Sequence, residues 1–130
     1  MNHSKIMLER FKVTPINGSR EDISFRLPCH QNNYSGHKDV YGRIRLSQPG
    51  PTRTTGCFNP SKGRFLHPWD NHGITIRHAA RFQTFPDDYI FMGGIISQGK
   101  QVGNAVPIRM GKEILKSCLK ILNNNEAIDL

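Results

Sequence analysis

Apolar side chains recur at helical spacing near the C-terminal end of the chain. In the segment 107–122 the charged side chains lie away from an apolar stripe made of Ile108, Ile114, Leu115, Cys118, Leu119 and Leu122. Pro107 suits the first position of such a helix. Burying each large side chain of the stripe is worth about 1.5–3 kcal/mol, so the helix needs a surface to cover. The loop-rich remainder of the chain is a poor candidate for that surface.

Two shorter helices are predicted elsewhere. Ser4 can cap a helix that runs to Phe11, where Thr14-Pro15 ends it and Asn17-Gly18 forms a turn. Thr75 can cap a second helix, which Pro86 prevents from continuing. Between 39 and 68, prolines and glycines interrupt short apolar or β-branched pieces, a pattern typical of short strands and long loops.

Composition places the chain among cytoplasmic proteins. Hydrophobic residues make up 36% of its 130 residues, and the mean hydropathy is -0.53. There is no run of about eighteen apolar residues and no signal-peptide pattern, so we expect no membrane association. Three widely spaced cysteines without a C-x-x-C argue against both a disulfide framework and a zinc knuckle. We therefore expect three reduced thiols.

Positive charge is concentrated in one part of the chain. The net charge is +8, and no acidic residue occurs between Asp39 and Asp70. Five basic residues fall in that interval: Arg43, Arg45, Arg53, Lys62 and Arg64. Such a stretch produces a positive field suited to a polyanion. From charge alone, a DNA-binding surface and a merely solvated loop are equally acceptable interpretations.

Two segments resemble conserved motifs of the C5-cytosine DNA methyltransferases. "GITIRHAARFQTFPDDYIF" (73–91) is similar to the ninth motif of that family, and "KQVGNAVP" (100–107) is similar to the tenth and last. The stretch 39–68 resembles the end of the target-recognition region in a bacterial branch, and "NGSREDISFRLPCH" (17–30) resembles the part just upstream. Together the similarity covers about residues 5–120, with the two motifs in family order and at the right spacing.

The resemblance implies that the chain is the C-terminal third of such an enzyme. The family's glycine-rich loop, its Pro-Cys-Gln nucleophile loop and its Glu-Asn-Val element do not occur here. The implied fold is α+β: a small, loop-rich, β-containing recognition domain with a short helix (1–95), then a cofactor-lid loop and C-terminal helix (96–123) and a tail (124–130). The amphipathic helix would dock on a Rossmann-like methyltransferase domain that this chain lacks.

Cys29 is the residue that most resembles a nucleophile. It follows Pro28, but the next residue is His30 instead of glutamine, and the segment falls in the recognition region. A catalytic thiolate needs a lowered pKa and a docked substrate. We therefore expect a structural or recognition-edge role for Cys29, and we assign this chain no catalytic residue and no metal ligand.

The resemblance also implies a DNA-binding set. Thr54 and Thr55 match a threonine-containing dipeptide that helps the family hold a flipped cytosine, although threonines at such positions can also be plain strand formers. The expected DNA contacts are Arg43, Arg45, Arg53, Thr54, Thr55, Lys62 and Arg64, with Arg43 the first choice for reading a base. The chain departs from the family pattern at Arg53, Gly56 and His78.

The tenth motif implies a cofactor contact. Gly103, Asn104, Ala105 and Val106 resemble the loop that closes over the methionine part of S-adenosylmethionine, a contact that requires a catalytic domain to be present. Arg77, Arg81 and Gln83 of the ninth motif match positions that organise the recognition region.

Three hypotheses about function remain open from the sequence. The first is a portion or subunit of a DNA (cytosine-5)-methyltransferase, with double-stranded DNA and a catalytic subunit as partners, bacterial and nucleoid-associated, and inactive alone. The second is a stand-alone basic DNA-binding remnant without enzymatic activity. The third is an independent enzyme that uses Cys29 and a histidine. Under the first, the exposed terminal stripe predicts self-association of the isolated chain.

Overall fold

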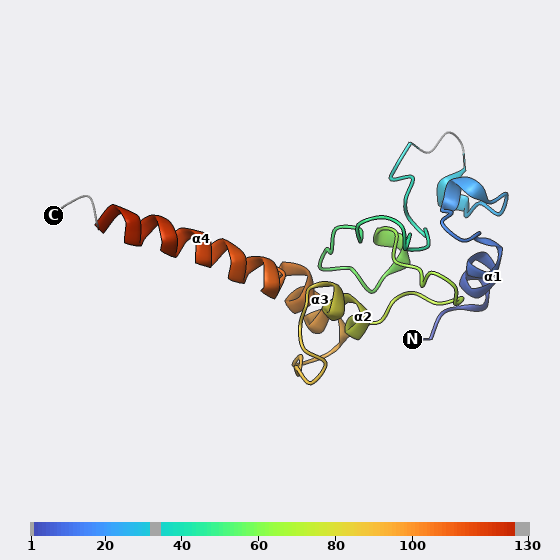
Figure 1. Ribbon diagram of the computed structural model, residues 1–130. Helices are drawn as coiled ribbons and strands as arrows, with labels where there is room; N and C mark the ends of the chain where they lie inside the picture. The colour runs from blue at the N-terminus through green and yellow to red at the C-terminus, as the bar shows by residue number, and fades with distance from the viewer. Residues whose placement is uncertain (1, 32–34, 127–130) are drawn as a thin grey trace.

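The computed structural model of the chain describes residues 2–31 and 35–126. Its elements, in chain order, are α1 (Lys5–Val13), η1 (Arg20–Asp22), η2 (Pro28–His30), η3 (Pro60–Lys62), α2 (Ile76–Phe82), α3 (Ile95–Asn104) and α4 (Ile108–Glu126). Figure 1 shows a body built from α1, the loops, α2 and α3, from which α4 projects. Among the helices described, none combines the length and the apolar character that a membrane crossing requires.

The two short helices begin where the sequence predicts; α1 runs to Val13, two residues beyond the expected end, and α2 ends at Phe82, ahead of Pro86. Ser4 caps α1, its Oγ accepting from the N–H of Met7 at 3.4 Å, and Thr14 is the C-cap residue. Asn17 follows in the left-handed conformation, with φ of 62°, and forms the predicted turn. Thr75 caps α2, and Gln83 ends it. Local capping chemistry is thus sufficient to place both helices.

The segment between 39 and 73 contains no strand, and the predicted β-structure is wrong for this part of the described chain. Pairing is limited to isolated bridges, parallel between Arg43 and Leu66 and antiparallel between Leu66 and Gly73. Prolines at positions 49, 51, 60 and 68 lack the N–H that a ladder requires. The described fold is therefore rich in helix and loop, with almost no strand.

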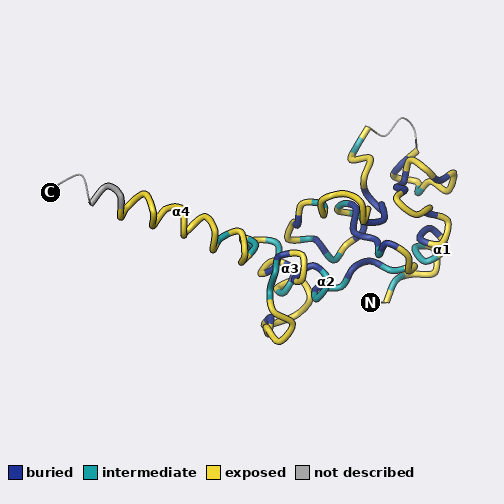
Figure 2. The backbone as a smooth tube through the Cα atoms, in the orientation of Figure 1, coloured by how far each residue is buried: buried dark blue, intermediate teal, exposed yellow. Residues whose placement is uncertain are grey.

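Two apolar clusters form the interior of the body. One contains Ile44, Cys57, Phe65, Ile74, Ile76, Ala79, Ala80, Phe91 and Val102, with Phe58 and Phe85 packed against it. The other contains Phe11, Val40, Tyr41 and Leu66, with Met7, Leu8 and Leu27 at its edge. Phe65 and Leu66 are adjacent in the chain but belong to different clusters. The segment that carries them therefore joins the two clusters. The buried parts of the chain in Figure 2 all lie in this body.

The region expected to be a cofactor-lid loop is mostly helix. Residues 100–104 form the second half of α3, which packs against α2. Only the three residues 105–107 separate α3 from α4.

Helix α4 has the predicted position and the predicted apolar stripe, and the stripe is exposed. From 112 to 123 every side chain is exposed, including Leu115 at 65%, Leu119 at 57% and Leu122 at 59%. Figure 2 shows the middle of the helix, beyond its first turn, in the colour of exposed residues. The body therefore does not supply the surface that this stripe needs.

Candidate nucleic-acid interface

The five basic residues of the acid-free stretch divide into buried and exposed groups. Arg43, Arg53 and Arg64 are 3%, 9% and 7% exposed, whereas Arg45 and Lys62 are exposed. A guanidinium that neutralises phosphate must reach solvent. The placement of the three buried arginines therefore does not match the phosphate or base contacts expected of them from the sequence.

Arg43 uses all of its hydrogen-bond donors inside the protein. Its Nε donates to the carbonyl of Thr14 at 2.8 Å, and Nη2 donates to the carbonyl of Phe11 at 2.7 Å. Its other bonds reach the carbonyls of His67 (3.0 Å) and Asp70 (2.6 Å) and Oδ1 of Asn71 (2.7 Å). A guanidinium has five N–H groups, so none is left for a base. Arg43 instead joins the end of α1 to the loop 67–71.

Arg64 makes a similar internal junction. Its Nη1 donates to the carbonyls of Asn17 at 3.0 Å, Gly18 at 2.8 Å and Arg43 at 3.0 Å. Its Nε donates to Oδ1 of Asp39 at 3.1 Å. A second buried cation, Arg64, therefore fixes the turn after α1 to the segment that carries the Arg43–Leu66 bridge.

Arg53 lies between aromatic rings without a hydrogen-bond partner among the described residues. Its guanidinium carbon is 3.9 Å from the ring centroid of Phe82 and 5.5 Å from that of Phe65. Cation–π attraction stabilises such a charge. Burial lowers the pKa of Arg53 to about 10, so it remains a cation at neutral pH. Burial also raises the pKa of the neighbouring Cys57 thiol, against a smaller opposing effect of Arg53.

The predicted threonine pair is exposed and rests on α3. A Cβ at position 103 would overlap the carbonyl group of Thr54 and the backbone nitrogen of Thr55. A Cβ at position 99 would overlap the ring of Phe58 and approach the carbonyl oxygen of Thr55. Two glycines four residues apart lie on one helix face and let the helix approach a backbone closely. The recognition-like and tenth-motif segments are thus in direct contact.

A hollow of about 610 Å³ lies beside this contact. Its lining includes Thr54, Thr55 and Lys62 from the predicted DNA-binding set and also Lys100 from α3. Lys100 and Lys62 are both exposed. Hydroxyl and ammonium groups gathered at one hollow are the donors that contact phosphate oxygens. Arg45 is exposed elsewhere, with its Nε donating to the carbonyl of Asn17 at 3.2 Å.

The four tenth-motif residues have different surroundings. The side chain of Asn104 is exposed, and Val106 is 57% exposed. Gly103 contacts the backbone of Thr54, so its lack of a side chain serves packing within this chain. The carbonyl of Ala105 accepts from Nε2 of Gln83 at 2.9 Å. Gly103, Ala105 and Val106 also line a hollow of about 450 Å³, together with Arg53 and Met110.

Ninth-motif side chains connect neighbouring segments. Gln83 Nε2 also donates to the carbonyl of Val102 at 3.1 Å, which joins the end of α2 to α3. Arg77 donates to the carbonyls of Pro86 at 3.3 Å and Tyr89 at 2.8 Å. Arg81 pairs with Asp87 on the surface, Nε to Oδ1 at 2.8 Å. These contacts join α2 to the segment that follows it and to the end of α3.

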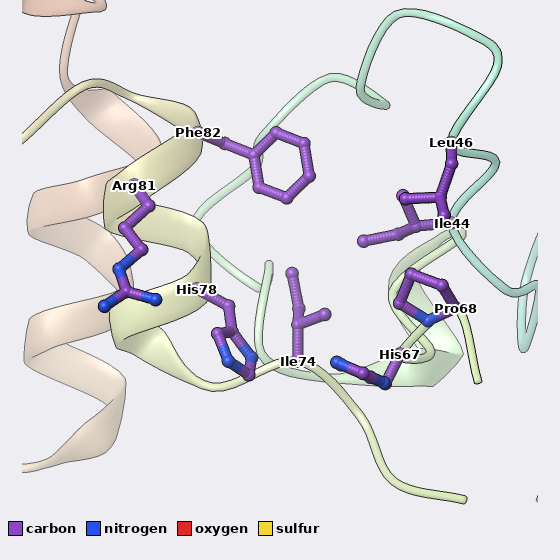
Figure 3. A pocket seen from close by; sticks show the side chains of 8 residues that line it. All are labelled: Ile44, Leu46, His67, Pro68, Ile74, His78, Arg81 and Phe82. Carbon is purple, nitrogen blue, oxygen red and sulfur yellow. The ribbon is translucent and has the colours of Figure 1, made fainter. Parts of the chain in front are cut away.

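His78 supplies a capping box in place of an acidic residue. Its Nδ1 accepts from the N–H of Thr75 at 3.4 Å, while its own N–H donates to Thr75 Oγ1 at 3.2 Å. Burial lowers the pKa of His78 and favours the neutral ring that can accept this bond. Figure 3 shows His78 with Arg81, Phe82 and Ile74 around a hollow of about 350 Å³.

Cys29 is exposed on η2. The adjacent His30 is buried, with Nδ1 3.5 Å from Nη2 of Arg10. Burial, and then the positive charges of Arg10, Arg20 and Arg26, lower the pKa of His30. His30 therefore favours its neutral form and lies among cations in the interior.

Sequence reasoning missed Lys100 and the glycine face beneath the threonine pair. The only available signal was the spacing of Gly99 and Gly103, which marks a face on which another backbone can pack.

Comparisons with known proteins give matches along nearly the whole chain. The family profile described as C-5 cytosine-specific DNA methylase matches residues 2–120. The Type II methyltransferase M1.HphI of Haemophilus parahaemolyticus is 36% identical over 97% of this chain and 31% of its own length. For M.Sau96I of Staphylococcus aureus the identity is 39%, over 88% of this chain and 28% of the relative.

The DNA (cytosine-5)-methyltransferase 1 of Mus musculus is 38% identical over 75% of this chain and 6% of that protein. The chain thus spans about a third or less of the length of these curated relatives.

Proposed function

Because the chain belongs to the C-5 cytosine-specific DNA methylase family, we propose that it is one portion of a DNA (cytosine-5)-methyltransferase. In this proposal the chain binds double-stranded DNA, helps hold the flipped cytosine and completes the S-adenosylmethionine pocket. A separate catalytic portion supplies the nucleophile, so this chain alone transfers no methyl group.

The contact between Thr54 and Gly103 is the observation that carries the proposal. It joins the segment proposed to face DNA to the segment proposed to face the cofactor. Because Gly103 has no side chain, the backbone of α3 lies directly against that of Thr54, and we expect the two segments to move together. Closing over cofactor and gripping DNA would therefore be coupled in one rigid unit.

The exposed groups form the proposed DNA-binding set. Thr54, Thr55 and Lys62 share one hollow with Lys100, and Arg45 adds a further exposed cation. A base that reacts at C5 and C6 must leave the stack, which costs a few kcal/mol and distorts the DNA backbone. Hydroxyl and ammonium contacts to phosphates would hold that distorted backbone. We assign Arg43, Arg53 and Arg64 to fixing the loops that present these groups.

We propose that this chain forms one wall of the S-adenosylmethionine pocket. Asn104 offers an exposed amide with donors and an acceptor, and Val106 offers an exposed apolar side chain. Ala105 lies between them and accepts a hydrogen bond from Gln83 through its carbonyl, while Gly103 packs on the backbone of Thr54. These residues fit one side of a bound S-adenosylmethionine, which would supply the methyl group. The catalytic portion would provide the opposite wall.

Helix α4 is the proposed joint with the catalytic portion. Its stripe is exposed, and only Pro107 separates α4 from Val106, the last residue of the proposed cofactor wall. Docking α4 on the catalytic domain would therefore also position Asn104 and Val106.

The test is reconstitution. The chain is mixed with the part of the Haemophilus parahaemolyticus relative that it does not match, and transfer of labelled methyl groups from S-adenosylmethionine to double-stranded DNA is measured. We expect no transfer from either portion alone and transfer from the mixture. Absence of transfer in a mixture whose portions are folded and associated would overturn the proposal.

The second hypothesis, a DNA-binding remnant, has its own observation: exposed cations and hydroxyls gathered at one hollow. It predicts salt-dependent DNA binding by the chain alone, without reconstitution of transfer. Lys62→Ala should weaken binding to all sequences alike and reduce the salt slope by about 1. Lys112→Ala on α4 is the matched control and should leave both unchanged.

A further inference from the structure

A group of metal-ligating side chains lies on the loop between Leu66 and Gly73, outside the proposed DNA and cofactor surfaces. One ligand atom from each of His67, Asp70 and His72 lies within 4.8 Å of the other two. Asp70 Oδ2 is 3.1 Å from Nδ1 of His67 and 3.6 Å from Nε2 of His72. Two imidazoles and a carboxylate are a donor set that zinc binds.

The loop that carries these residues is fixed at both ends and in the middle. Leu66 bridges to Gly73, and the N–H of His67 donates to the carbonyl of His72 at 2.9 Å. Arg43 donates to the carbonyls of His67 and Asp70. The backbone positions of all three ligands are therefore set by bonds that a metal ion does not have to supply. Such preorganisation is what a metal site requires of its scaffold.

The hydrogen bond of the His72 imidazole also favours ligation. Nδ1 of His72 lies 2.8 Å from the carbonyl oxygen of Gly73, an acceptor, which places the proton on Nδ1. The lone pair of its Nε2 is then directed at the Asp70 carboxylate. A backbone carbonyl behind a ligating imidazole is a common way to fix its tautomer.

Nδ1 of His67 accepts the N–H of Asp70 at 3.1 Å, so an ion bound at this nitrogen would take the place of that hydrogen bond. The anionic oxygen of Asp70 lies near both ring nitrogens, and a cation bound among the three atoms would be attracted by its charge. Asp70 and His72 are the more exposed partners, with side chains 63% and 38% exposed, so an ion can enter from solvent.

We propose that His67, Asp70 and His72 form a binding site for a divalent cation of the zinc type, with a solvent molecule in the fourth position. The bound ion would clamp the loop that Arg43 holds from the other side. Its neighbour is the hollow of Figure 3, where the rings of His67 and His78 turn toward each other with centroids 5.6 Å apart. The site would thereby stabilise the entry into α2 from the loop.

The experiment uses the full, untagged chain with Cys29→Ser and Cys118→Ser, because both of these thiols are exposed and bind zinc themselves. Zn²⁺ is titrated calorimetrically, and Co²⁺ is followed by its visible absorption. We expect one ion per chain, imidazole-type Co²⁺ bands and a higher melting temperature with Zn²⁺. Asp70→Asn and His72→Gln should each weaken binding at least about tenfold.

The matched control is His37→Gln, which removes an exposed histidine that lines a different hollow and should leave binding unchanged. Melting temperatures in chelator should agree among parent, Asp70→Asn and His72→Gln, which shows that the variants are folded. The proposal is overturned if the parent binds no ion at millimolar Zn²⁺, or if the double variant Asp70→Asn/His72→Gln binds as tightly as the parent.

Discussion

The body of the molecule and helix α4 differ in where their apolar and charged side chains lie. In the body, apolar side chains form two interior clusters, and buried arginines satisfy backbone carbonyls. In α4, both the charged side chains and the apolar stripe face solvent. Most of the stability of helices in proteins comes from the packing of an amphipathic face. The body thus has an interior of its own, whereas the stripe of α4 has no covering surface in the described part of the chain.

The comparison also separates two kinds of positive charge. Arg43 and Arg64 lie where loop carbonyls converge, and their guanidinium groups bind those carbonyls. Lys62 and Lys100 lie at a hollow on the surface. Net charge therefore shows that a polyanion partner is reasonable, but only burial and hydrogen bonding show which cations are available to it.

The largest expected effect is on the affinity of α4 for the proposed catalytic portion. Leu115→Lys with Leu119→Lys removes two apolar contacts of about 1.5–3 kcal/mol each from the proposed docking surface. Association with the complementary catalytic portion should weaken more than about 100-fold, measured by calorimetric titration. Lys112→Ala with Lys116→Ala changes the charged side chains of the same helix and serves as control. Unchanged affinity in the leucine variant would contradict the docking role.

The next effect concerns the interior of the body. Arg43→Ala removes the guanidinium donor from four backbone carbonyls and should lower the free energy of unfolding by about 3 kcal/mol or more. Urea unfolding followed by the fluorescence of Trp69, the single tryptophan, measures this. The exposed Arg45→Ala should change stability by less than about 0.5 kcal/mol. Equal stability of the two variants would show that Arg43 is not a structural junction.

A smaller effect is expected at the contact between α3 and the threonine pair. Gly103→Ala forces the backbone of Thr54 to move and should destabilise the body by about 1–3 kcal/mol in the same urea assay. Gly111→Ala in α4 meets only a methyl group of Val106 at 3.8 Å and should raise helix content without destabilising the body. If Gly103→Ala left the stability unchanged, it would contradict the proposed coupling of the Thr54 segment with α3.

The smallest effect is a pH dependence. His30 faces Arg10, Arg20, Arg26 and Glu21, and burial with the three cations lowers its pKa below the ordinary 6.5. Below pH 6.5 the unfolded chain takes up a proton that the folded chain does not accept until lower pH. Stability should therefore fall as pH drops through this range. His30→Gln should flatten the fall and the exposed His37→Gln should not; identical profiles for parent and His30→Gln would refute this.

Local patterns predicted part of this fold. Ser4, Thr75 and Pro107 mark the starts of α1, α2 and α4, because capping and helix entry depend on neighbouring residues. Helix α3 was not predicted, since Gly99 and Gly103 are poor helix formers that are explained only by what packs on them.

The function of Arg43 was not predictable from the sequence either. Its acceptors lie 24 to 32 residues away along the chain, so they converge only in the folded structure. The predicted DNA-binding set therefore mixed surface donors such as Lys62 with interior cations. The threonine pair and the tenth motif were found by resemblance, but their contact with each other required the structure.

Hydrogen–deuterium exchange along α4 tests the central claim, that this helix is completed by another portion of the enzyme. The exchange of residues 108–126 is measured in the monomeric chain alone and after mixing with the complementary catalytic portion. The account predicts rapid exchange in α4 of the free chain beside a protected body, and strong protection of α4 in the mixture. Protection of α4 equal to that of the body in the free monomer would contradict it.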